Sequence, residues 1–232
     1  MPFGLSTHLF HGERLARRHL ETIAAHGFGR VELFATRTHF DYHDGAEVER
    51  MRGWLSELGL VAGSMHAPIC ASLLQGEWGP SFSNAAGRAA RRQEAVDETR
   101  VAMAAARALG CASVVVHIGL PNELNFSLDD NDAGAARRSL EELAAIASDS
   151  GVRLALEVIP NDLSTPDALL QWLDGELELG DAGICLDVGH AHLLGGAPEA
   201  AEALGGHVIT THIHDNDGTG DTHLVPFAGT LD

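Results

Sequence analysis

Seven short apolar runs, separated by longer amphipathic stretches, constrain the fold of this chain more than any other feature. The apolar runs cover residues 3–10, 30–35, 61–68, 111–119, 152–160, 183–190 and 207–215. Between them lie helix-like stretches at 12–26, 45–58, 85–109, 132–149, 166–174 and 197–204. Strands that alternate with such helices predict βα units and a parallel sheet. The runs lack strict polar–apolar alternation, which is typical of strands buried on both faces.

This succession favours an α/β fold, a (β/α)8 TIM barrel that lacks its eighth βα unit in this sequence. A doubly wound sheet is the alternative, but no G-x-G-x-x-G follows the first strand. We expect helices to end at Gly59, Gly110 and Gly151. The 232 residues contain no linker or repeat, and 45% of them are hydrophobic, which is enough for one core. We therefore predict a single TIM-barrel domain over residues 1–232, with strand 8 missing or truncated.

Acidic residues outnumber basic ones by 33 to 15, which gives a formal net charge of −18. An acidic surface repels phosphate backbones and anionic lipids, so nucleic-acid and membrane association are disfavoured. No run is as long as a membrane span, and the first residues do not resemble a secretory signal. The scattered cysteines Cys70, Cys111 and Cys185 form no CxxC pair and suit a reducing compartment. We expect a cytoplasmic protein with buried thiols.

Each predicted strand carries one ionisable or metal-binding residue near its carboxyl end. These residues are His8, Glu32, His66, His117, Glu157, Asp187 and His212. In a parallel barrel all strand carboxyl ends open onto one face, where active sites are built. Buried charges need partners or a metal ion. Imidazole nitrogens with carboxylate oxygens favour a first-row divalent ion such as Zn²⁺, Mn²⁺ or Co²⁺ over Ca²⁺.

The strength of the signal differs between these positions. Glu157 is surrounded by leucine, valine and isoleucine and needs a cation or a donor, whereas His8 and Glu32 are expected to be structural or at most close to a substrate. Asp187 and the loop residue His190 can reach one cavity. His212 and His214 lie two residues apart and share a strand face, so one could bind a metal while the other supports it.

Two features of the loops extend this picture. Asp221 and His223 form a D-x-H pair that could hold a second metal ion. Trp78 lies in the long loop at 69–84, after the third strand, where it could stack on a sugar ring or cover the site. The arginines within residues 88–92 are expected to lie on the solvated face of a helix rather than to bind phosphate.

The motifs SMHAP, VVVHIG, LALEVIP, CLDVGHAH, HIHDN and GDTHLVPFAGTLD occur in this order along the chain. In this set the sequence resembles the xylose isomerase-like TIM barrel superfamily. That superfamily takes in sugar (phosphate) isomerases and epimerases and the endonuclease IV-like nucleases that cut at abasic sites. The resemblance covers essentially the whole chain and is specific to the superfamily rather than to one activity.

The resemblance implies a metal site of Glu157, Asp187 and His212, with Mn²⁺, Zn²⁺, Co²⁺ or Mg²⁺ as the ion. It implies catalytic roles for Glu157, as ligand and proton shuttle, and for His190, facing the substrate. The nuclease version adds His66, His117, Asp221 and His223 as further metal ligands; in an isomerase, His66 and His117 would contact substrate hydroxyls. Both versions use a glutamate on strand 8 that is not in this sequence, and Phe227-Ala228-Gly229 stands where G-E-G is usual.

The leading hypothesis is a metal-dependent isomerase or epimerase of a small sugar or related hydroxy-carbonyl compound, acting through a metal-stabilised enediolate. The alternatives are a zinc-dependent abasic-site phosphodiesterase and an inactive binding or scaffold member of the same fold. The missing glutamate favours the inactive member. Open edges at the first and seventh strands would favour pairing with another chain, so we expect either a homo-oligomer or a longer natural polypeptide.

Overall fold

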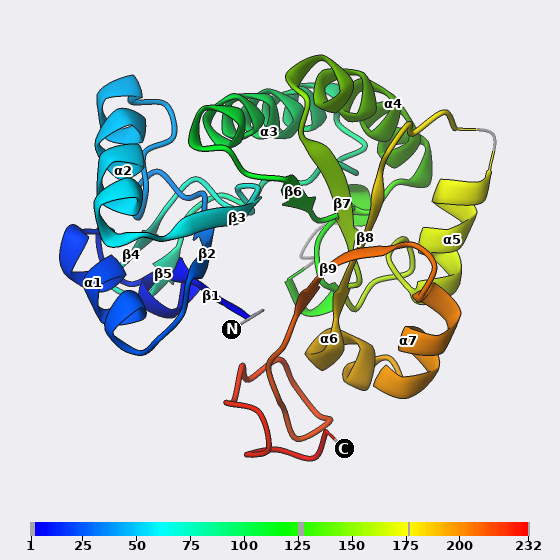
Figure 1. Cartoon of the computed structure of the whole chain (residues 1–232). Coiled ribbons are helices and arrows are strands. Elements are labelled where there is room, and N and C mark those ends of the chain that lie inside the picture. The colour runs from blue at the N-terminus through cyan, green and yellow to red at the C-terminus, as the bar shows by residue number, and fades with distance from the viewer. Residues whose placement is uncertain (1–2, 125–127, 176, 232) are drawn as a thin grey trace. The chain divides into compact units, whose positions relative to one another are not determined.

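The computed structural model describes residues 3–124, 128–175 and 177–231. The chain divides into two compact units (Figure 1). The first consists of Met1–Phe82, Gln93–Val115 and Ala145–Arg153, and the second of Ser83–Arg92, Val116–Ala144 and Leu154–Asp232. The assignment of residues 1–232 to a single domain stays a prediction.

The first unit is built on parallel strands in the order β1-β2-β3-β6. They are β1 (Gly4–Ser6), β2 (Arg30–Phe34), β3 (Val61–His66) and β6 (Ser113–Val116). The helical elements are η1 (Thr7–Phe10), α1 (Arg17–Ala25), α2 (Gly45–Leu58) and α3 (Ala89–Leu109), of which the first turn belongs to the second unit. A small antiparallel hairpin, β4 (Leu73–Leu74) and β5 (Glu77–Trp78), lies in the stretch predicted to be a loop.

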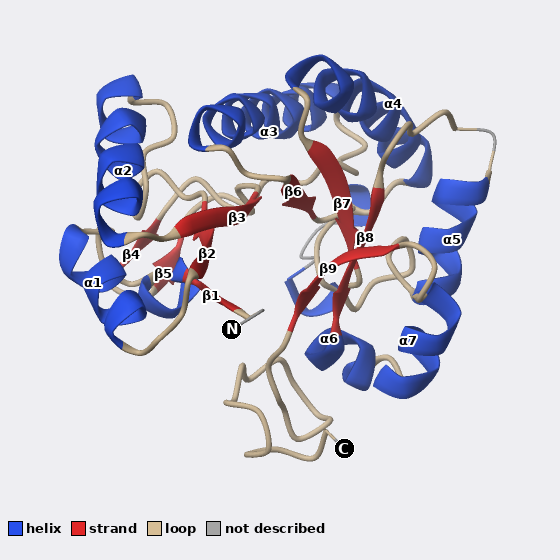
Figure 2. Cartoon of the chain, viewed as in Figure 1, coloured by secondary structure: helices blue, strands red, loops and turns tan. Residues whose placement is uncertain are grey.

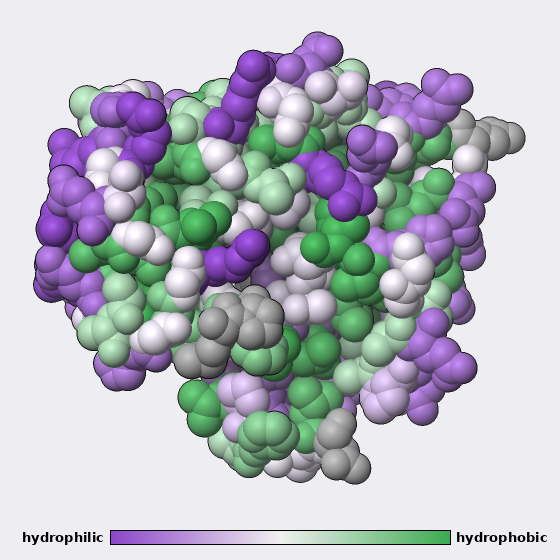
Figure 3. Space-filling view, viewed as in Figure 1, coloured by the Kyte–Doolittle hydropathy of each residue, from purple (hydrophilic) through white to green (hydrophobic). Residues whose placement is uncertain are grey.

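Helix α2 shows how local signals fix these elements. Asp44 caps its amino end by accepting a hydrogen bond from the backbone N–H of Ala46 at 2.9 Å. Met51 and Leu55 are buried on its inner face, whereas hydrophilic side chains cover the outer surface of α1 and α2 (Figure 3). Gly59 ends α2 with a φ of +65°, a conformation that favours glycine. Gly110 and Gly151, the other two predicted helix ends, also have positive φ.

The second unit is built on parallel strands in the order β7-β8-β9. They are β7 (Arg153–Glu157), β8 (Gly183–Asp187) and β9 (Val208–His212). The helical elements are η2 (Asn122–Leu124), η3 (Leu128–Asp130), α4 (Ala133–Ser150), α5 (Pro166–Asp174), α6 (Val188–Leu193) and α7 (Ala197–Leu204). The part of α4 from Ala145 onward belongs to the first unit. Helices α5 and α7 lie side by side. The segment after β9 contains no helix or regular strand in the residues described (Figure 2).

The observed fold is α/β with parallel strands of the TIM-barrel type, as the alternation of apolar and amphipathic stretches predicts. All seven predicted strands are present, and α2, α5 and α7 occupy the predicted residues. Two strands end earlier than predicted, and a helix follows each one directly. The strand predicted over 3–10 ends at Ser6 and is followed by η1, and the strand predicted over 183–190 ends at Asp187 and is followed by the short helix α6. The side chain of Asp187 accepts the backbone N–H of His190 at 2.8 Å and so begins that helix.

The three cysteines are buried thiols outside any disulfide, as expected. Burial raises the pKa of Cys70 to about 11 and that of Cys111 to about 12, so both thiols stay protonated at neutral pH. Over the residues that the structure describes, no helix has the length and apolar character needed to cross a membrane.

Candidate metal centre

Three neighbouring strands of the second unit end in potential metal ligands. Glu157 is the last residue of β7, Asp187 of β8 and His212 of β9. Because the strands are parallel, their carboxyl ends lie at one edge, and Asp187 is directly paired with His212 in the strand register. His212 Nδ1 lies 2.7 Å from Glu157 Oε1 and 3.6 Å from Asp187 Oδ2. The structure thus brings together the three residues that the sequence singled out as the metal set.

Two further histidines extend this cluster. His117, which follows β6, places Nε2 2.9 Å from Glu157 Oε2. His190 lies on α6 rather than in a loop, and its Nδ1 is 3.5 Å from Asp187 Oδ2 and 3.8 Å from Glu157 Oε1. Nδ1 of His190 also lies 2.9 Å from the carbonyl oxygen of Val158, to which it donates when it carries a proton. The carboxylate of Glu157 is therefore surrounded by three imidazoles.

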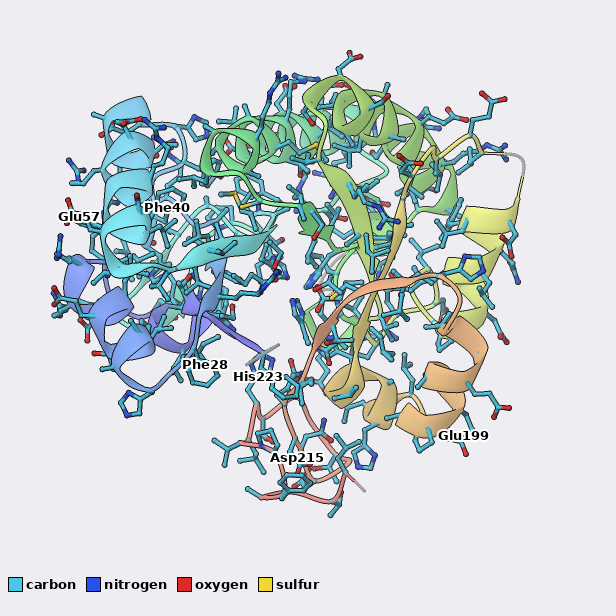
Figure 4. The ribbon with its side chains drawn as sticks, in the orientation of Figure 1. Phe28, Phe40, Glu57, Glu199, Asp215 and His223 are labelled. Atoms are coloured by element: carbon cyan, nitrogen blue, oxygen red, sulfur yellow. The ribbon has the colours of Figure 1, made fainter. Side chains whose placement is uncertain are left out.

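The loop after β9 brings the predicted D-x-H pair to the same region. Asp221 Oδ2 lies 3.2 Å from His190 Nε2 and 3.1 Å from His223 Nε2. Figure 4 shows Asp215 and His223 on this segment. Asp215 is buried, and its carboxylate accepts the backbone N–H groups of Gly229 at 2.9 Å and Leu231 at 3.0 Å. These bonds close the loop on itself and help to position its two candidate ligands.

The cluster is strongly coupled electrostatically. Burial would raise the pKa of Glu157, but His212 and His117 outweigh it and hold the pKa well below its usual range. Burial would likewise raise the pKa of Asp187, but His190, His212 and His214 outweigh it and lower that pKa. The pKa of His190 is lowered by burial but raised to about 9 overall, mainly by Asp187 and Asp221. The carboxylates are therefore ionised at neutral pH, the form that binds a cation.

The donor atoms fit a divalent cation. Within the second unit they form three groups whose candidate ligand atoms lie within 4.8 Å of one another: Glu157, Asp187 and His190; Glu157, Cys185 and His212; and His190, His214, Asp221 and His223. Carboxylate oxygens combined with imidazole nitrogens suit Mn²⁺, Co²⁺ or Zn²⁺. Buried carboxylates need compensating positive charge, which the surrounding imidazoles supply here and which a bound cation could also supply.

One member of these groups, Cys185, was not predicted, and another, His214, was predicted without a definite role. Cys185 was interpreted only as a core thiol, but it lies within reach of Glu157 and His212. His214 was left between binding and supporting roles; its Nε2 lies 3.0 Å from Asp187 Oδ1. The period of two between His212 and His214 was the available signal. This spacing predicts that the two side chains point the same way. It does not predict that His214 contacts Asp187, which lies 27 residues away in the chain.

The remaining predicted residues belong to the first unit. His66 is buried at the end of β3, with Nδ1 2.8 Å from the carbonyl oxygen of Ala67. Trp78 lies on the β4–β5 hairpin and is half exposed, with its ring centroid 5.3 Å from that of His11. Glu32 accepts hydrogen bonds from Ser6 at 3.1 Å and Ser64 at 2.8 Å, which agrees with its expected structural role. The parts predicted for His66 and Trp78 in the site stay predictions.

Comparison with known proteins places this geometry in a family. A family model described as xylose isomerase-like TIM barrel matches residues 20–232. The uncharacterized protein MJ1311 of Methanocaldococcus jannaschii is 31% identical over 247 residues, covering 97% of this chain and 74% of the relative.

Two solved structures share the fold. A D-tagatose 3-epimerase-like protein is 26% identical with a TM-score of 0.81, and the match covers 100% of this chain and 83% of that one. A D-psicose 3-epimerase, solved in the presence of D-fructose, is 17% identical with a TM-score of 0.70, covering 95% and 77% respectively. With the family model matching nearly the whole chain, the protein belongs to the xylose isomerase-like TIM barrel family.

Proposed function

We propose that the protein is a divalent-metal-dependent isomerase or epimerase of a small sugar or a related hydroxy-carbonyl compound. The observation that carries this proposal is the convergence of Glu157, Asp187 and His212 at the ends of three neighbouring parallel strands. The similarity to an epimerase-like protein over the whole chain supports the sugar class of substrate.

Glu157, Asp187 and His212 would hold the metal ion. A bound divalent cation would supply Lewis-acid chemistry, polarising adjacent carbonyl and hydroxyl oxygens and stabilising the negative charge that develops when a proton leaves the carbon between them. Glu157 is ionised and buried in the second unit, so it is able to take up that proton and return it. One carboxylate would thus serve both as ligand and as acid/base group.

His190 is suited to fix a substrate oxygen. Its Nδ1 lies 2.9 Å from the carbonyl oxygen of Val158 and its Nε2 lies 3.2 Å from Asp221, so the ring is held from both sides. With a proton on each nitrogen, the imidazole donates to both acceptors. Exchange of Asp221 for a substrate hydroxyl or oxyanion at Nε2 would keep the same donor geometry. We propose that His190 orients the substrate at this nitrogen.

Elemental analysis of the purified protein is the first test, because it gives the metal and its stoichiometry. One Mn, Co or Mg ion per chain supports the isomerase or epimerase, and no metal after titration contradicts it. The second test incubates a panel of ketoses and aldoses with the protein in D₂O and follows deuterium entry at the carbon next to the carbonyl by NMR. Metal binding without exchange or isomerisation of any substrate would favour a binding role instead.

A second function is favoured by one observation. His117 contacts Glu157, and Asp221 contacts both His190 and His223. Most of the ligands expected in the abasic-site nucleases therefore lie within the second unit. The net charge of −18 opposes it, because duplex binding draws its affinity from Lys and Arg at phosphates. Three zinc ions per chain, together with cleavage of an abasic duplex, would favour the nuclease over the isomerase.

A further inference from the structure

His214 lies between two groups of candidate ligands. Its Nε2 is 3.0 Å from Asp187 Oδ1 and 3.2 Å from Oδ2, and a carboxylate only accepts, so Nε2 carries the proton and donates it. On its other side, Nδ1 is 3.7 Å from Asp221 Oδ1, and the ring centroid is 4.1 Å from that of His223. Nδ1 is buried and has no hydrogen-bond partner among the described residues.

A glycine on α6 makes room for this ring. A Cβ atom built on Gly189 would lie 2.1 Å from Cε1, 2.4 Å from Nδ1 and 2.6 Å from Nε2 of His214. Contacts this short do not occur, so any side chain at position 189 has to displace the imidazole. Within a helix, glycine is less favourable than alanine. The absence of a side chain at Gly189 is therefore explained by the space that His214 occupies.

The two carboxylate oxygens of Asp187 have different contacts, and both contacts require the same orientation of the carboxylate. Its Oδ1 caps α6 through the backbone N–H of His190 at 2.8 Å, while Oδ2 faces His212 at 3.6 Å. A carboxylate with a single hydrogen-bond partner can rotate, whereas a donor that reaches both oxygens restricts that rotation. Loss of such an outer partner typically lowers metal affinity 10–100-fold.

We infer that His214 is a positioning residue that orients the Asp187 carboxylate for cation binding, and that Gly189 is required because the His214 ring fills its side-chain space. This inference rests on the proposed function, since it concerns the ligands of the same site. It goes further by assigning roles to two residues that do not themselves need to touch the ion or the substrate.

The test is a double-mutant cycle read by isothermal titration with Mn²⁺. His214→Ala and Gly189→Ala are each expected to weaken Mn²⁺ binding by about 10–100-fold. The double variant should bind no more weakly than either single variant, because both changes remove the same support. His214→Gln, whose amide can donate to Asp187, should recover part of the affinity. His207→Ala, at the residue just before β9 and far along the strand from His212, is the matched control and should bind as the wild type does.

The outcomes separate the inference from the proposed function. Wild-type binding with unchanged affinity in His214→Ala overturns the role of His214 and leaves the metal site standing. Strictly additive losses in the double variant overturn the link between Gly189 and His214. A wild type that binds no Mn²⁺, Co²⁺ or Zn²⁺ overturns the proposed function and the inference together. Circular dichroism of every variant shows that the comparison is made between folded proteins. If His214→Ala fails to fold, His214→Leu, which fills the space but cannot donate a hydrogen bond, takes its place with the same expected loss.

Discussion

Glu157 is the residue on which the candidate site depends most. Its two oxygens contact His212 and His117 at 2.7 and 2.9 Å from within the buried end of β7. Glu157→Gln keeps the shape of the side chain but removes the charge and the proton-accepting oxygen. We expect Mn²⁺ affinity to fall at least about 10-fold, in line with losses on altering metal sites, and turnover of any substrate to be lost.

The measurements are Mn²⁺ titration and deuterium exchange, each beside Glu202→Gln as a matched control. Glu202 is exposed on α7 in the same unit, so its variant should behave like the wild type. Retained exchange in Glu157→Gln would show that the proton is carried by another group.

Because of His11, the stability of the folded protein should depend on pH. Its ring is 4% exposed, and burial, assisted by His39 and His66, lowers its pKa from 6.5 to about 4. Between these values the unfolded chain binds a proton that the folded chain does not. Stability is therefore complete above about pH 7, falls as pH drops through 6.5, and levels off below about 4.

The expected loss is at most about 3 kcal/mol. Urea unfolding at a series of pH values measures it. In His11→Gln the free energy of unfolding should depend less steeply on pH between 6.5 and 4, by an amount that corresponds to the uptake of up to one proton on unfolding. An unchanged slope would mean that His11 is protonated in the folded protein as readily as in the unfolded one.

Individual residues also show what the sequence can and cannot predict about the site. Glu157, Asp187 and His212 are among the seven residues that could be found because each ends an apolar strand and parallel strands bring their ends together. Their selection as the metal set depended on the resemblance to the family. The contact between Gly189 and His214 could not be predicted from the sequence. It depends on the packing of α6 against the chain after β9, and nothing in the local pattern of either segment requires it.

At the scale of elements, Gly53 in α2 and Gly59 directly after it lead to opposite predictions for an alanine substitution. Gly59 has a φ of +65°, and Gly53 lies in the helix interior; neither has a heavy atom within 4 Å of an added Cβ. Gly59→Ala should destabilise the protein by about 1 kcal/mol, because alanine is strained in the left-handed conformation. Gly53→Ala should stabilise it by about 0.5–1 kcal/mol, because alanine is the better helix former.

Thermal and urea unfolding of both variants measure the difference. Because neither position offers contacts to a new methyl group, the two changes isolate backbone preference from packing. Equal shifts in the same direction would show that the end of α2 is not fixed by the conformation of Gly59.

Elements with strong local signals were predicted most accurately. Helices α2, α5 and α7 each begin after a capping residue or with a proline and end near a glycine, and their predicted bounds agree with the structure. Helix α6 was missed because its six residues follow β8 without an intervening turn. A helix that short carries less than two turns of periodicity, so the only signal was Asp187, which was already interpreted as a ligand.

For the whole molecule, the alternation of strands and helices was sufficient to predict the fold class, because few architectures accommodate repeated βα units. Which substrate the protein takes could not be predicted in the same way, since one fold supports many chemistries. The net charge of the whole chain, however, predicts how its stability depends on salt, whatever its substrate is.

The net charge of −18 should make stability rise with salt. Like charges repel more strongly in the compact state than in the expanded one, and salt screens this repulsion. The opposing effect is weaker, because exposed ion pairs such as Arg17–Glu21 and Arg52–Glu49 contribute little to stability in water. With only 15 basic residues against 33 acidic ones, most carboxylates lie in a field of their own sign.

We therefore expect the melting temperature to rise by a few degrees between about 10 and 200 mM NaCl, the range over which the Debye length falls from about 30 Å to below 10 Å. The experiment requires removal of divalent cations by a chelator, because binding at the candidate metal centre would itself stabilise the folded chain. Repeating it with Mn²⁺ present should give a smaller salt effect, since a bound cation neutralises part of the acidic cluster. A melting temperature that falls with NaCl in the chelated protein would mean that ion pairs, rather than repulsion among carboxylates, dominate its electrostatics.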